Sequence, residues 1–295
     1  MTKALHVNST APFRIRQKGK KYKIDSFEIL TTILSALTWR RDNGSIKLYA
    51  DSMALEYYDS LGILDLWDGG IDTETLDRAP DNIDQNIFWA AGKLIALRNE
   101  PAPVAMIDTD LIVWRPITDI LQREKVSVLH RESLNPEVYI RKEHLKIRPG
   151  YRFDPEWDWE EPACNNALVY IANQEFKDYY TDCAIDFMTE NREQPQELVS
   201  QMVFAEQRML AMCARQKQFP VHHFLDDPFQ QDNTTFTHIW GGKSIARMYA
   251  NQDEMLCSVL LRKIEKLFPD YYRKISDSGL VYEILPESEE ENMKG

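Results

Sequence analysis

Two carboxylates follow the end of an apolar run at a spacing that suits a cation. The run 103–107 leads directly into Asp108-Thr109-Asp110. In extended backbone, side chains at positions i and i+2 point to the same side. Unpaired carboxylates this close raise each other's pKa, so a cation between them favours the ionised form of both, and oxygen ligands suit Mg²⁺ or Mn²⁺. The pattern favours a divalent-cation site; the alternative is a solvated acidic turn at the end of a strand.

A second group of chemically useful residues lies far downstream, at 237–243. His238 can supply a further metal ligand. Gly241 and Gly242 allow the backbone to approach a phosphate closely, and Lys243 offers that phosphate a positive charge. The alternative is a buried histidine beside a glycine turn.

Three further groups have side chains that suit a sugar or a phosphate. The amides of Asn165 and Asn166 precede an apolar strand, where they could bind sugar hydroxyls or could cap and turn the backbone. Lys93 lies on a predicted helix just before the Asp108 strand and could reach a donor phosphate, although most helical lysines face solvent. Glu206 and Gln207 lie within an amphipathic pattern, for which the alternative is an exposed charged face.

The elements that must position these residues alternate between helix and strand. Helical spacing of apolar residues predicts helices, and short apolar runs predict strands buried on both faces. This alternation predicts the layered α/β class, in which ligands bind beyond the carboxyl ends of the strands. The predicted helices are 25–41, a helix through Tyr57 that ends at Gly62, and 84–98, and the predicted strands are 4–8, 46–50, 103–107, 126–129 and 167–171.

Taken in order, these motifs resemble those of the GT-A-fold glycosyltransferases, especially family 8-like enzymes and related uncharacterised bacterial proteins. The match comprises the strand with Asp108-Thr109-Asp110, the asparagine before a strand, Glu206-Gln207, and His-x-x-Gly-x-Lys at 238–243. It covers most of the chain, from the first helix to Lys243. The resemblance implies a GT-A-like (Rossmann-like nucleotide-diphospho-sugar transferase) α/β fold, with a mixed, mostly parallel central sheet flanked by helices.

The resemblance also implies a role for each matching residue. A nucleotide-sugar donor, usually a UDP-sugar, would be held through Mn²⁺ or Mg²⁺, with Asp108, Asp110 and His238 as ligands. Glu206 and Gln207 match the polar pair near the transferred sugar and are the candidate catalytic residues. The other donor contacts that the resemblance implies are Lys93, Thr109, Asn165, Asn166, Gly241, Gly242 and Lys243. The chain departs from the family 8 pattern at Lys243, which comes one residue early, and at strand 4–8, which lacks the aspartate and tyrosine of the uracil-binding segment.

These roles imply transfer of a hexose from a UDP-sugar to a hydroxyl of a saccharide or glycolipid. The transition state places negative charge on the leaving diphosphate, which a bound divalent cation stabilises as a Lewis acid. The resemblance suggests retention of the anomeric configuration. One alternative is a haloacid dehalogenase-like phosphatase with Asp108 as nucleophile, although that motif normally lies near the N-terminus. The other is a non-catalytic nucleotide-sugar-binding protein.

Two stretches are candidates for the acceptor side. Trp157 and Trp159 lie in the polar, proline-containing insertion 131–162, where they could stack on sugar rings or pack back onto the domain. Residues 14–23 hold six basic side chains, which could attract an anionic acceptor or a membrane surface, or could form a solvated loop. We expect a single domain over 1–285 and an acidic, flexible tail over 286–295.

Composition limits the classes of protein that remain. The chain has 295 residues, 47 acidic and 35 basic, and its net charge of −12 argues against a nucleic-acid partner. No apolar run is long enough to cross a bilayer, and the first residues do not lead into a signal-peptide core, so we expect a cytoplasmic protein with at most peripheral membrane contact. The four cysteines have no C-x-x-C spacing, so we expect small buried thiols.

Overall fold

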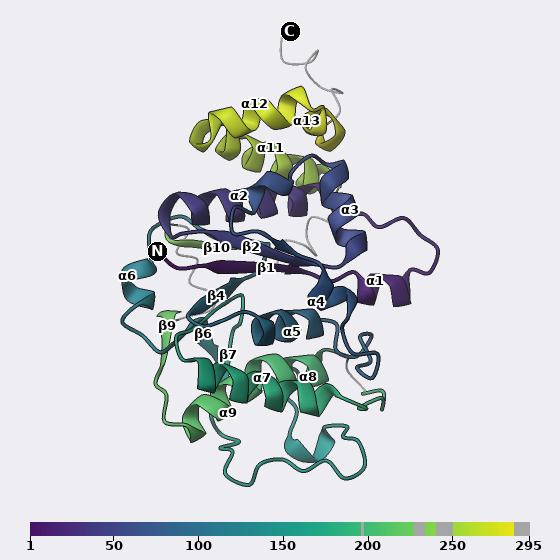
Figure 1. Cartoon of the computed structure of the whole chain (residues 1–295), viewed down its shortest axis with the longest axis vertical. Helices are drawn as coiled ribbons and strands as arrows, with labels where there is room; N and C mark the ends of the chain where they lie inside the picture. The colour runs from purple at the N-terminus through teal and green to yellow at the C-terminus, as the bar shows by residue number, and fades with distance from the viewer. Residues whose placement is uncertain (196–197, 227–233, 240–249, 286–295) are drawn as a thin grey trace.

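The molecule is built around an eight-stranded mixed sheet with the order β3-β2-β1-β4-β8-β6-β7, in which β9 also pairs with β6 (Figure 1). The computed structural model describes residues 1–195, 198–226, 234–239 and 250–285. Strands β1 to β4 are parallel to one another, whereas β8 is antiparallel to β4 and β6. The strands are β1 (Ala4–Asn8), β2 (Ile46–Ala50), β3 (Ile71–Asp72), β4 (Val104–Ile107), β5 (Leu111–Val113), β6 (Val126–Glu132), β7 (Ala163–Cys164), β8 (Leu168–Ile171), β9 (Val221–Leu225) and β10 (Phe236–His238). The expected α/β class with a mixed central sheet is confirmed.

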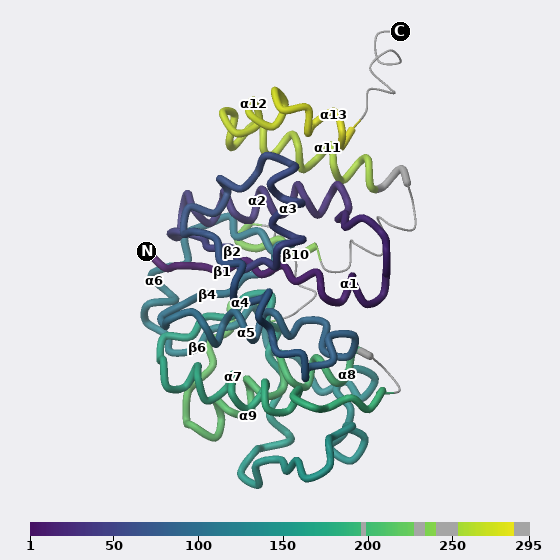
Figure 2. The backbone as a smooth tube through the Cα atoms, turned by 45° about the vertical axis from the view of Figure 1, so that its right-hand side comes forward, coloured from purple at the N-terminus to yellow at the C-terminus, as the bar shows by residue number. Residues whose placement is uncertain are grey.

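Helices cover both faces of this sheet (Figures 1 and 2). One face carries α2, with α11 to α13 stacked above it, and the other face carries α5, α7 and α9. The insertion predicted at 131–162 is mostly irregular and lies at the opposite end of the molecule from α11 to α13. The helices are α1 (Ala11–Arg16), α2 (Ser26–Asp42), α3 (Ser52–Ser60), α4 (Glu74–Asp77), α5 (Ala91–Asn99), α6 (Thr118–Leu121), α7 (Gln174–Met188), α8 (Leu198–Val203), α9 (Met209–Gln216), α11 (Ala250–Leu267), α12 (Pro269–Asp277) and α13 (Leu280–Ile284).

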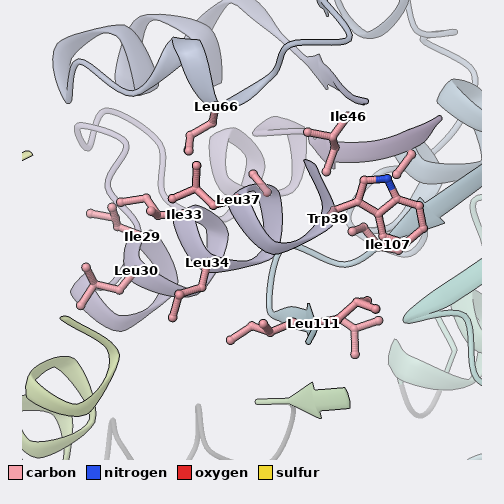
Figure 3. Packing of buried hydrophobic residues seen from close by; sticks show 14 of the residues in the cluster. Ile29, Leu30, Ile33, Leu34, Leu37, Trp39, Ile46, Leu66, Ile107 and Leu111 are labelled. Atoms are coloured by element: carbon pink, nitrogen blue, oxygen red, sulfur yellow. The ribbon is translucent and has the colours of Figure 1, made fainter. Parts of the chain in front are cut away.

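Strand β4 is buried on both faces, as its uninterrupted apolar sequence predicted. Successive side chains of a strand point to opposite faces. Ala105 and Ile107 therefore pack into the core beneath α2, whereas Val104 and Met106 pack into the core beneath α5 and α7. Figure 3 shows the first of these cores, where α2 covers Ile107 and the following β5. This double burial fixes the point at which the chain leaves β4.

Helix α2 begins where its sequence predicts. Asp25 and Glu28 form a reciprocal capping box, which satisfies free N–H groups of the first turn. The helix ends before Gly44, whose φ of 144° lies in a region that favours glycine. A Cβ atom at Gly44 would also meet the backbone oxygen of Thr2. A glycine at this position therefore allows α2 to turn tightly into β2.

The helix predicted over 84–98 is wrong at its start, because α5 begins only at Ala91. Arg16 donates to the backbone oxygen of Asn86, the group that would accept from the N–H of Ala90 in a continuous helix. The N–H of Ala90 contacts the sulfur of Met202 instead. Phe88 is fully buried and packs edge-on against the ring of Phe187. The N–H of Phe88 still bonds to the oxygen of Asp84 as in a helix, but these tertiary contacts interrupt the helix before Ala91.

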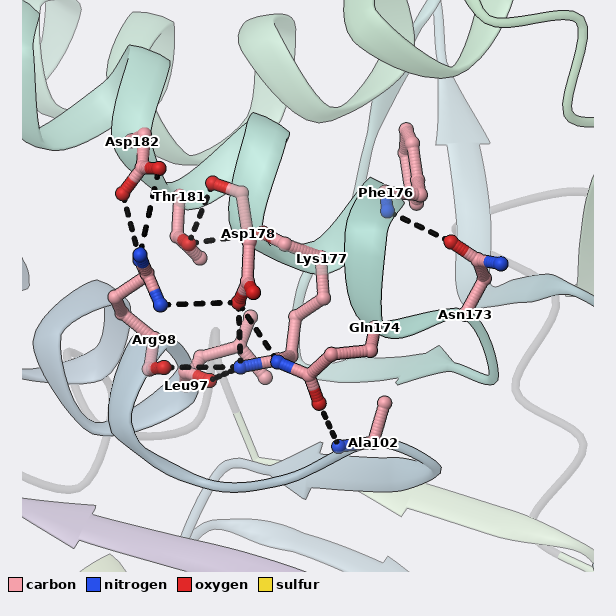
Figure 4. A network of polar contacts seen from close by, with 10 residues as sticks. All are labelled: Leu97, Arg98, Ala102, Asn173, Gln174, Phe176, Lys177, Asp178, Thr181 and Asp182. Atoms are coloured by element: carbon pink, nitrogen blue, oxygen red, sulfur yellow. Dashed lines mark hydrogen bonds and ion pairs between the residues drawn. The ribbon is translucent and has the colours of Figure 1, made fainter.

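The carboxyl end of α5 is clamped to α7 by Lys177. This side chain has 0% exposure, and its ammonium donates to the backbone oxygens of Leu97 and Arg98 at 2.9 Å (Figure 4). Burial lowers the pKa of Lys177, but Asp178 lies 3.2 Å away and opposes that shift. A cation at the last carbonyls of a helix satisfies groups that the helix itself leaves free. The clamp holds α5, which carries Lys93, against the sheet.

The strand order reverses between β1 and β4, and in open α/β sheets such a reversal leaves a crevice at the carboxyl ends. Because β8 is antiparallel to both β4 and β6, the ends of β4 and β6 point to the same edge. The beginning of β8 lies between them. This carboxyl edge therefore gathers the residues that follow β4, precede β8 and end β6.

All four cysteines are free thiols, and Cys164, Cys213 and Cys257 are buried.

In the part of the chain that the structure describes, no helix has the length and apolarity needed to span a membrane.

A buried hydrogen-bonded chain through His6 joins β1 to β5. Trp67 donates to Nδ1 of His6, Nε2 of His6 lies 3.0 Å from Ser35 Oγ, and that hydroxyl donates to the backbone oxygen of Leu111. Since Nδ1 accepts, the proton of the neutral ring lies on Nε2. Burial lowers the pKa of His6 to about 3, although Asp110 opposes that shift. The fold therefore requires a neutral His6.

This requirement predicts a pH dependence of stability. The pKa of His6 is about 3 in the fold against an ordinary value of 6.5, so below pH 6.5 the unfolded chain binds one more proton. The free energy of unfolding should fall by about 1.4 kcal/mol for each pH unit between about pH 6 and about pH 4.5. Urea unfolding across this range measures it. The His6→Asn variant should lose this slope, whereas a variant of the exposed His144, His144→Asn, should keep it; equal slopes in all three proteins would contradict the role of His6.

Candidate functional site

The two aspartates that follow β4 lie at the carboxyl edge of the sheet. The backbone N–H of Asp108 donates to the oxygen of Ala167 at 2.8 Å, and the N–H of Leu111 closes a turn onto the oxygen of Asp108. Asp108 is 27% exposed at its side chain, whereas Asp110 is buried. The turn is thus fixed at both ends, and the two carboxylates are held at the carboxyl edge of the sheet.

Strand β10 brings His238 to this turn. It pairs antiparallel with β5, so that His238 lies opposite Leu111 and the N–H of Ile239 donates to the oxygen of Asp110. The side chains of Trp114 and Thr237 add a hydrogen bond of 2.8 Å between the same two strands. As a result, Nε2 of His238 lies 3.7 Å from a carboxylate oxygen of Asp110.

These three side chains form a candidate metal site. One ligand atom each from Asp108, Asp110 and His238 lies within 4.8 Å of the other two. An octahedral Mg²⁺ or Mn²⁺ holds neighbouring ligands about 3 Å apart and opposite ligands about 4 Å apart. Two carboxylate oxygens and one imidazole nitrogen at this separation fit such an ion after small side-chain movements, with the remaining positions open to phosphate oxygens or water.

Lys93 lies between Asp108 and Glu206. Its ammonium is 2.7 Å from an oxygen of Asp108 and 2.6 Å from an oxygen of Glu206. Burial lowers the pKa of Lys93, but the two carboxylates outweigh burial and raise it above its ordinary value. Gly92 allows this position, because a Cβ atom there would meet the Cβ of Ser9 at 2.9 Å. The predicted phosphate contact of Lys93 is therefore limited to its third N–H group.

Glu206 is displayed by a π-helical turn, Phe204–Arg208, between α8 and α9. Its side chain is 3% exposed, and burial and the Asp108 carboxylate raise its pKa, while Lys93 opposes that shift. The backbone oxygen of Glu206 accepts hydrogen bonds from Asn166 at 2.7 Å and Tyr180 at 2.6 Å. Single π-helical turns often occur at functional sites. Asn166 is buried and its amide N–H braces this turn, and its contact with a donor sugar stays a prediction.

Asn165 and Gln207 belong to a cluster with Glu132 and Tyr139, two residues that no sequence motif indicated. The amide of Asn165 donates to an oxygen of Glu132 at 2.8 Å, and the hydroxyl of Tyr139 lies 2.7 Å from the other oxygen of Glu132. The same hydroxyl lies 2.6 Å from the side-chain oxygen of Gln207. Strand β6 was predicted to end at Leu129, but it continues to Glu132. Asp108 was identified as a polar residue at the carboxyl end of a buried strand. The same criterion, applied to the full length of β6, identifies Glu132.

The two tryptophans predicted for an acceptor pack back onto the domain. Trp157 is 5% exposed, and Trp159 stacks on Phe204 with ring centroids 5.5 Å apart. Arg208 ties the insertion to the π-helical turn by donating to the backbone oxygen of Trp159 at 2.6 Å. The aromatic face of Trp159 is therefore used for packing, and the insertion forms a wall beside the turn that displays Glu206.

The other predicted residues are placed as follows. Thr109 lies in the turn between Asp108 and Asp110 and is partly exposed. The basic residues of 14–23 are exposed, and the first of them belong to α1, where Arg14 lies 3.9 Å from Asp51. Gly241, Gly242 and Lys243 lie outside the described residues, as does the tail 286–295.

The ion pairs of Lys93 predict a specific stability effect. The Lys93→Met variant leaves the buried Glu206 carboxylate without its cation, which should lower the free energy of unfolding by about 3 to 5 kcal/mol at neutral pH. The loss should shrink at about pH 5, because protonation of Glu206 removes the buried charge. Urea unfolding at both pH values tests this. In the double variant Lys93→Met/Glu206→Gln most of the stability should return; a double variant no more stable than Lys93→Met would contradict the pairing.

Comparison with known proteins gives one family and several distant structures. A family model described as "Family of unknown function (DUF6734)" matches residues 15–278. No curated protein matches the sequence. Among solved structures, mouse xyloside xylosyltransferase 1 in its apo form is 9% identical, covers 76% of this chain and 84% of its own, and has a TM-score of 0.38.

Two other structures are similarly distant. The galactosyltransferase LgtC in complex with donor and acceptor sugar analogues is 10% identical over 69% of this chain and 70% of its own, with a TM-score of 0.36. HddC from Yersinia pseudotuberculosis is 9% identical over 81% of this chain and 94% of its own, with a TM-score of 0.39. At these identities and TM-scores, the similarity alone assigns no activity to this chain.

Proposed function

The chain belongs to the family of unknown function DUF6734, and from its own site we propose that it is a metal-dependent glycosyltransferase. It would move a hexose from a nucleotide-sugar, most simply a UDP-sugar, to a hydroxyl of a saccharide or glycolipid. The motif order that resembles GT-A-fold glycosyltransferases supports this proposal, because four of its parts carry side chains that meet at one edge of the sheet.

One observation carries the proposal. Ligand atoms of Asp108, Asp110 and His238 lie within 4.8 Å of one another after β4, one of the two strands between which the strand order reverses. Hard oxygen ligands with open positions suit a cation that also binds phosphate oxygens. In a chain of net charge −12, such a cation is the simplest means of holding an anionic diphosphate.

The chain's own residues then have separate tasks in the proposed reaction. A bound Mn²⁺ or Mg²⁺ would supply Lewis-acid stabilisation of the leaving diphosphate. Lys93 orients the Asp108 carboxylate and keeps a positive charge beside the departing group. Burial raises the pKa of the Glu206 carboxyl, and Lys93 opposes that rise. In its ionised form, Glu206 would stabilise the positive charge that develops on the sugar ring.

The phosphatase alternative is not favoured by the geometry. Such a phosphatase needs a second acidic group near the Asp108 nucleophile, and Asp226, which follows strand β9, is a candidate for that group. Asp226 follows β9 and is almost fully exposed, with its carboxylate 3.3 Å from His223. Strands β8 and β6 separate β9 from β4, so Asp226 cannot join Asp108 across the sheet.

The proposal predicts metal-dependent cleavage of a nucleotide-sugar. Release of UDP from UDP-glucose, UDP-galactose and UDP-N-acetylglucosamine should be detectable with Mn²⁺ and should stop with EDTA. The Asp110→Asn variant should lose about 100-fold or more of this activity, because it removes a charged ligand from the cation. In the control variant Asp119→Asn, an exposed aspartate of α6 is changed, and the rate should stay the same.

Binding provides a second readout of the same prediction. A UDP-sugar that binds the folded chain together with Mn²⁺ should raise the melting temperature of the wild type and of Asp119→Asn, but not that of Asp110→Asn. Hydrolysis by Asp110→Asn at the wild-type rate, or a wild type that neither binds nor cleaves any of the three donors, would overturn the proposed function.

A further inference from the structure

A second carboxylate site lies beside the metal site, at the end of β6. Glu132 ends this strand at the same edge of the sheet as Asp108, with the start of β8 between the two. The Glu132 side chain is 28% exposed, so a ligand can reach it. Neither the motif order nor the metal site accounts for this residue.

The cluster around Glu132 is rich in hydrogen-bond acceptors. One carboxylate oxygen accepts from Asn165 and the other lies 2.7 Å from the hydroxyl of Tyr139. Burial and the nearby Glu132 carboxylate raise the pKa of Tyr139, so this hydroxyl keeps its proton. That single proton faces both Glu132 and the side-chain oxygen of Gln207, 2.6 Å away. A carboxylate accepts about four hydrogen bonds, so Glu132 has room for further donors.

The Glu132 cluster is connected to the π-helical turn that carries Glu206, which belongs to the proposed sugar-transfer site. Asn165 is next to Asn166, which holds the π-helical turn, and Gln207 is next to Glu206 within that turn. Tyr139 comes from the insertion, which Arg208 ties to the same turn. Two residues of the Glu132 cluster, Asn165 and Gln207, are therefore sequence neighbours of residues at the turn that carries Glu206. The insertion borders the cluster through Tyr139.

We propose that Glu132, held by Asn165 and Tyr139, binds the acceptor of the reaction by accepting hydrogen bonds from hydroxyls of a neutral saccharide. This inference rests on the proposed glycosyltransferase function and adds the acceptor side to it. A partly exposed carboxylate accepts strongly from sugar hydroxyls, whereas it repels a phosphorylated sugar. In this assignment Glu132 contacts the acceptor directly, and Asn165 and Tyr139 are positioning residues that set the orientation of its carboxylate.

The ratio between sugar transfer to an acceptor and hydrolysis of the donor by water tests this assignment. With UDP-sugar and Mn²⁺ fixed, product formation is measured with lactose, methyl β-galactoside, methyl β-glucoside and glucose 6-phosphate as acceptor probes. The wild type should transfer to at least one neutral probe in preference to the phosphorylated one. The Glu132→Gln variant should raise the acceptor KM by about tenfold or more and lower the ratio of transfer to hydrolysis to a similar extent, while the donor KM changes by less than about twofold.

Three further variants separate binding from folding. Tyr139→Phe keeps the ring but removes the hydroxyl, so it should raise the acceptor KM by less than Glu132→Gln does. The controls are Glu137→Gln, an exposed carboxylate of the insertion, and Tyr151→Phe, a packed tyrosine of the insertion. Both should keep the wild-type acceptor KM and partition ratio.

Each outcome has a defined meaning. A parallel fall of transfer and hydrolysis in Glu132→Gln, no change in either, or a wild type that uses only the phosphorylated probe or none of the probes would overturn the acceptor assignment. Failure of the proposed function is recognised separately, because the wild type would then release no UDP from any donor, and the acceptor assignment would fail with it.

Discussion

The concentration of negative charge at the carboxyl edge of the sheet is the constraint on which the site depends. Asp108, Asp110 and Glu206 lie together with Lys93, which contacts two of the three carboxylates. When all four groups are ionised, their sum is two negative charges in a partly buried corner of an already acidic chain. Such a corner is costly unless a cation neutralises it. In the proposed function, a divalent ion held by the two aspartates and His238 would supply the missing charge and leave positions for an anionic diphosphate.

The fold meets this constraint by bracing the charged residues from distant segments. The pairing of β5 with β10 fixes His238 beside Asp110. The hydrogen-bonded chain through His6 ends at the backbone oxygen of Leu111 in β5. Asn166 holds the turn that carries Glu206. The braces are neutral hydrogen bonds, and the charged groups of the site contact one another. The neutral His6 and the amide of Asn166 therefore support the charged residues of the site without adding charge to it.

The sequence predicted those parts that depend on local pattern. Strands 4–8 and 46–50 are confirmed at both ends, and helix α2 begins at its capping box, because short apolar runs and caps act within a few residues. The start of α5 could not be predicted, because Ala90 and Phe88 make contacts with Met202 and Phe187, which lie far away in the sequence. For the same reason, the buried role of Asn166 and the packing of Trp159 on Phe204 depend on contacts that no local pattern contains.

The coordination of one divalent cation by residues far apart in the chain is the central claim, and pulsed electron paramagnetic resonance of bound Mn²⁺ tests it most directly. We expect one tightly bound Mn²⁺ per chain, with a nitrogen coupling from a single imidazole ligand. This coupling should disappear in His238→Gln and persist in His223→Gln, which changes an exposed histidine of β9. Bound Mn²⁺ without nitrogen coupling, or with a coupling that survives in His238→Gln, would contradict the metal site.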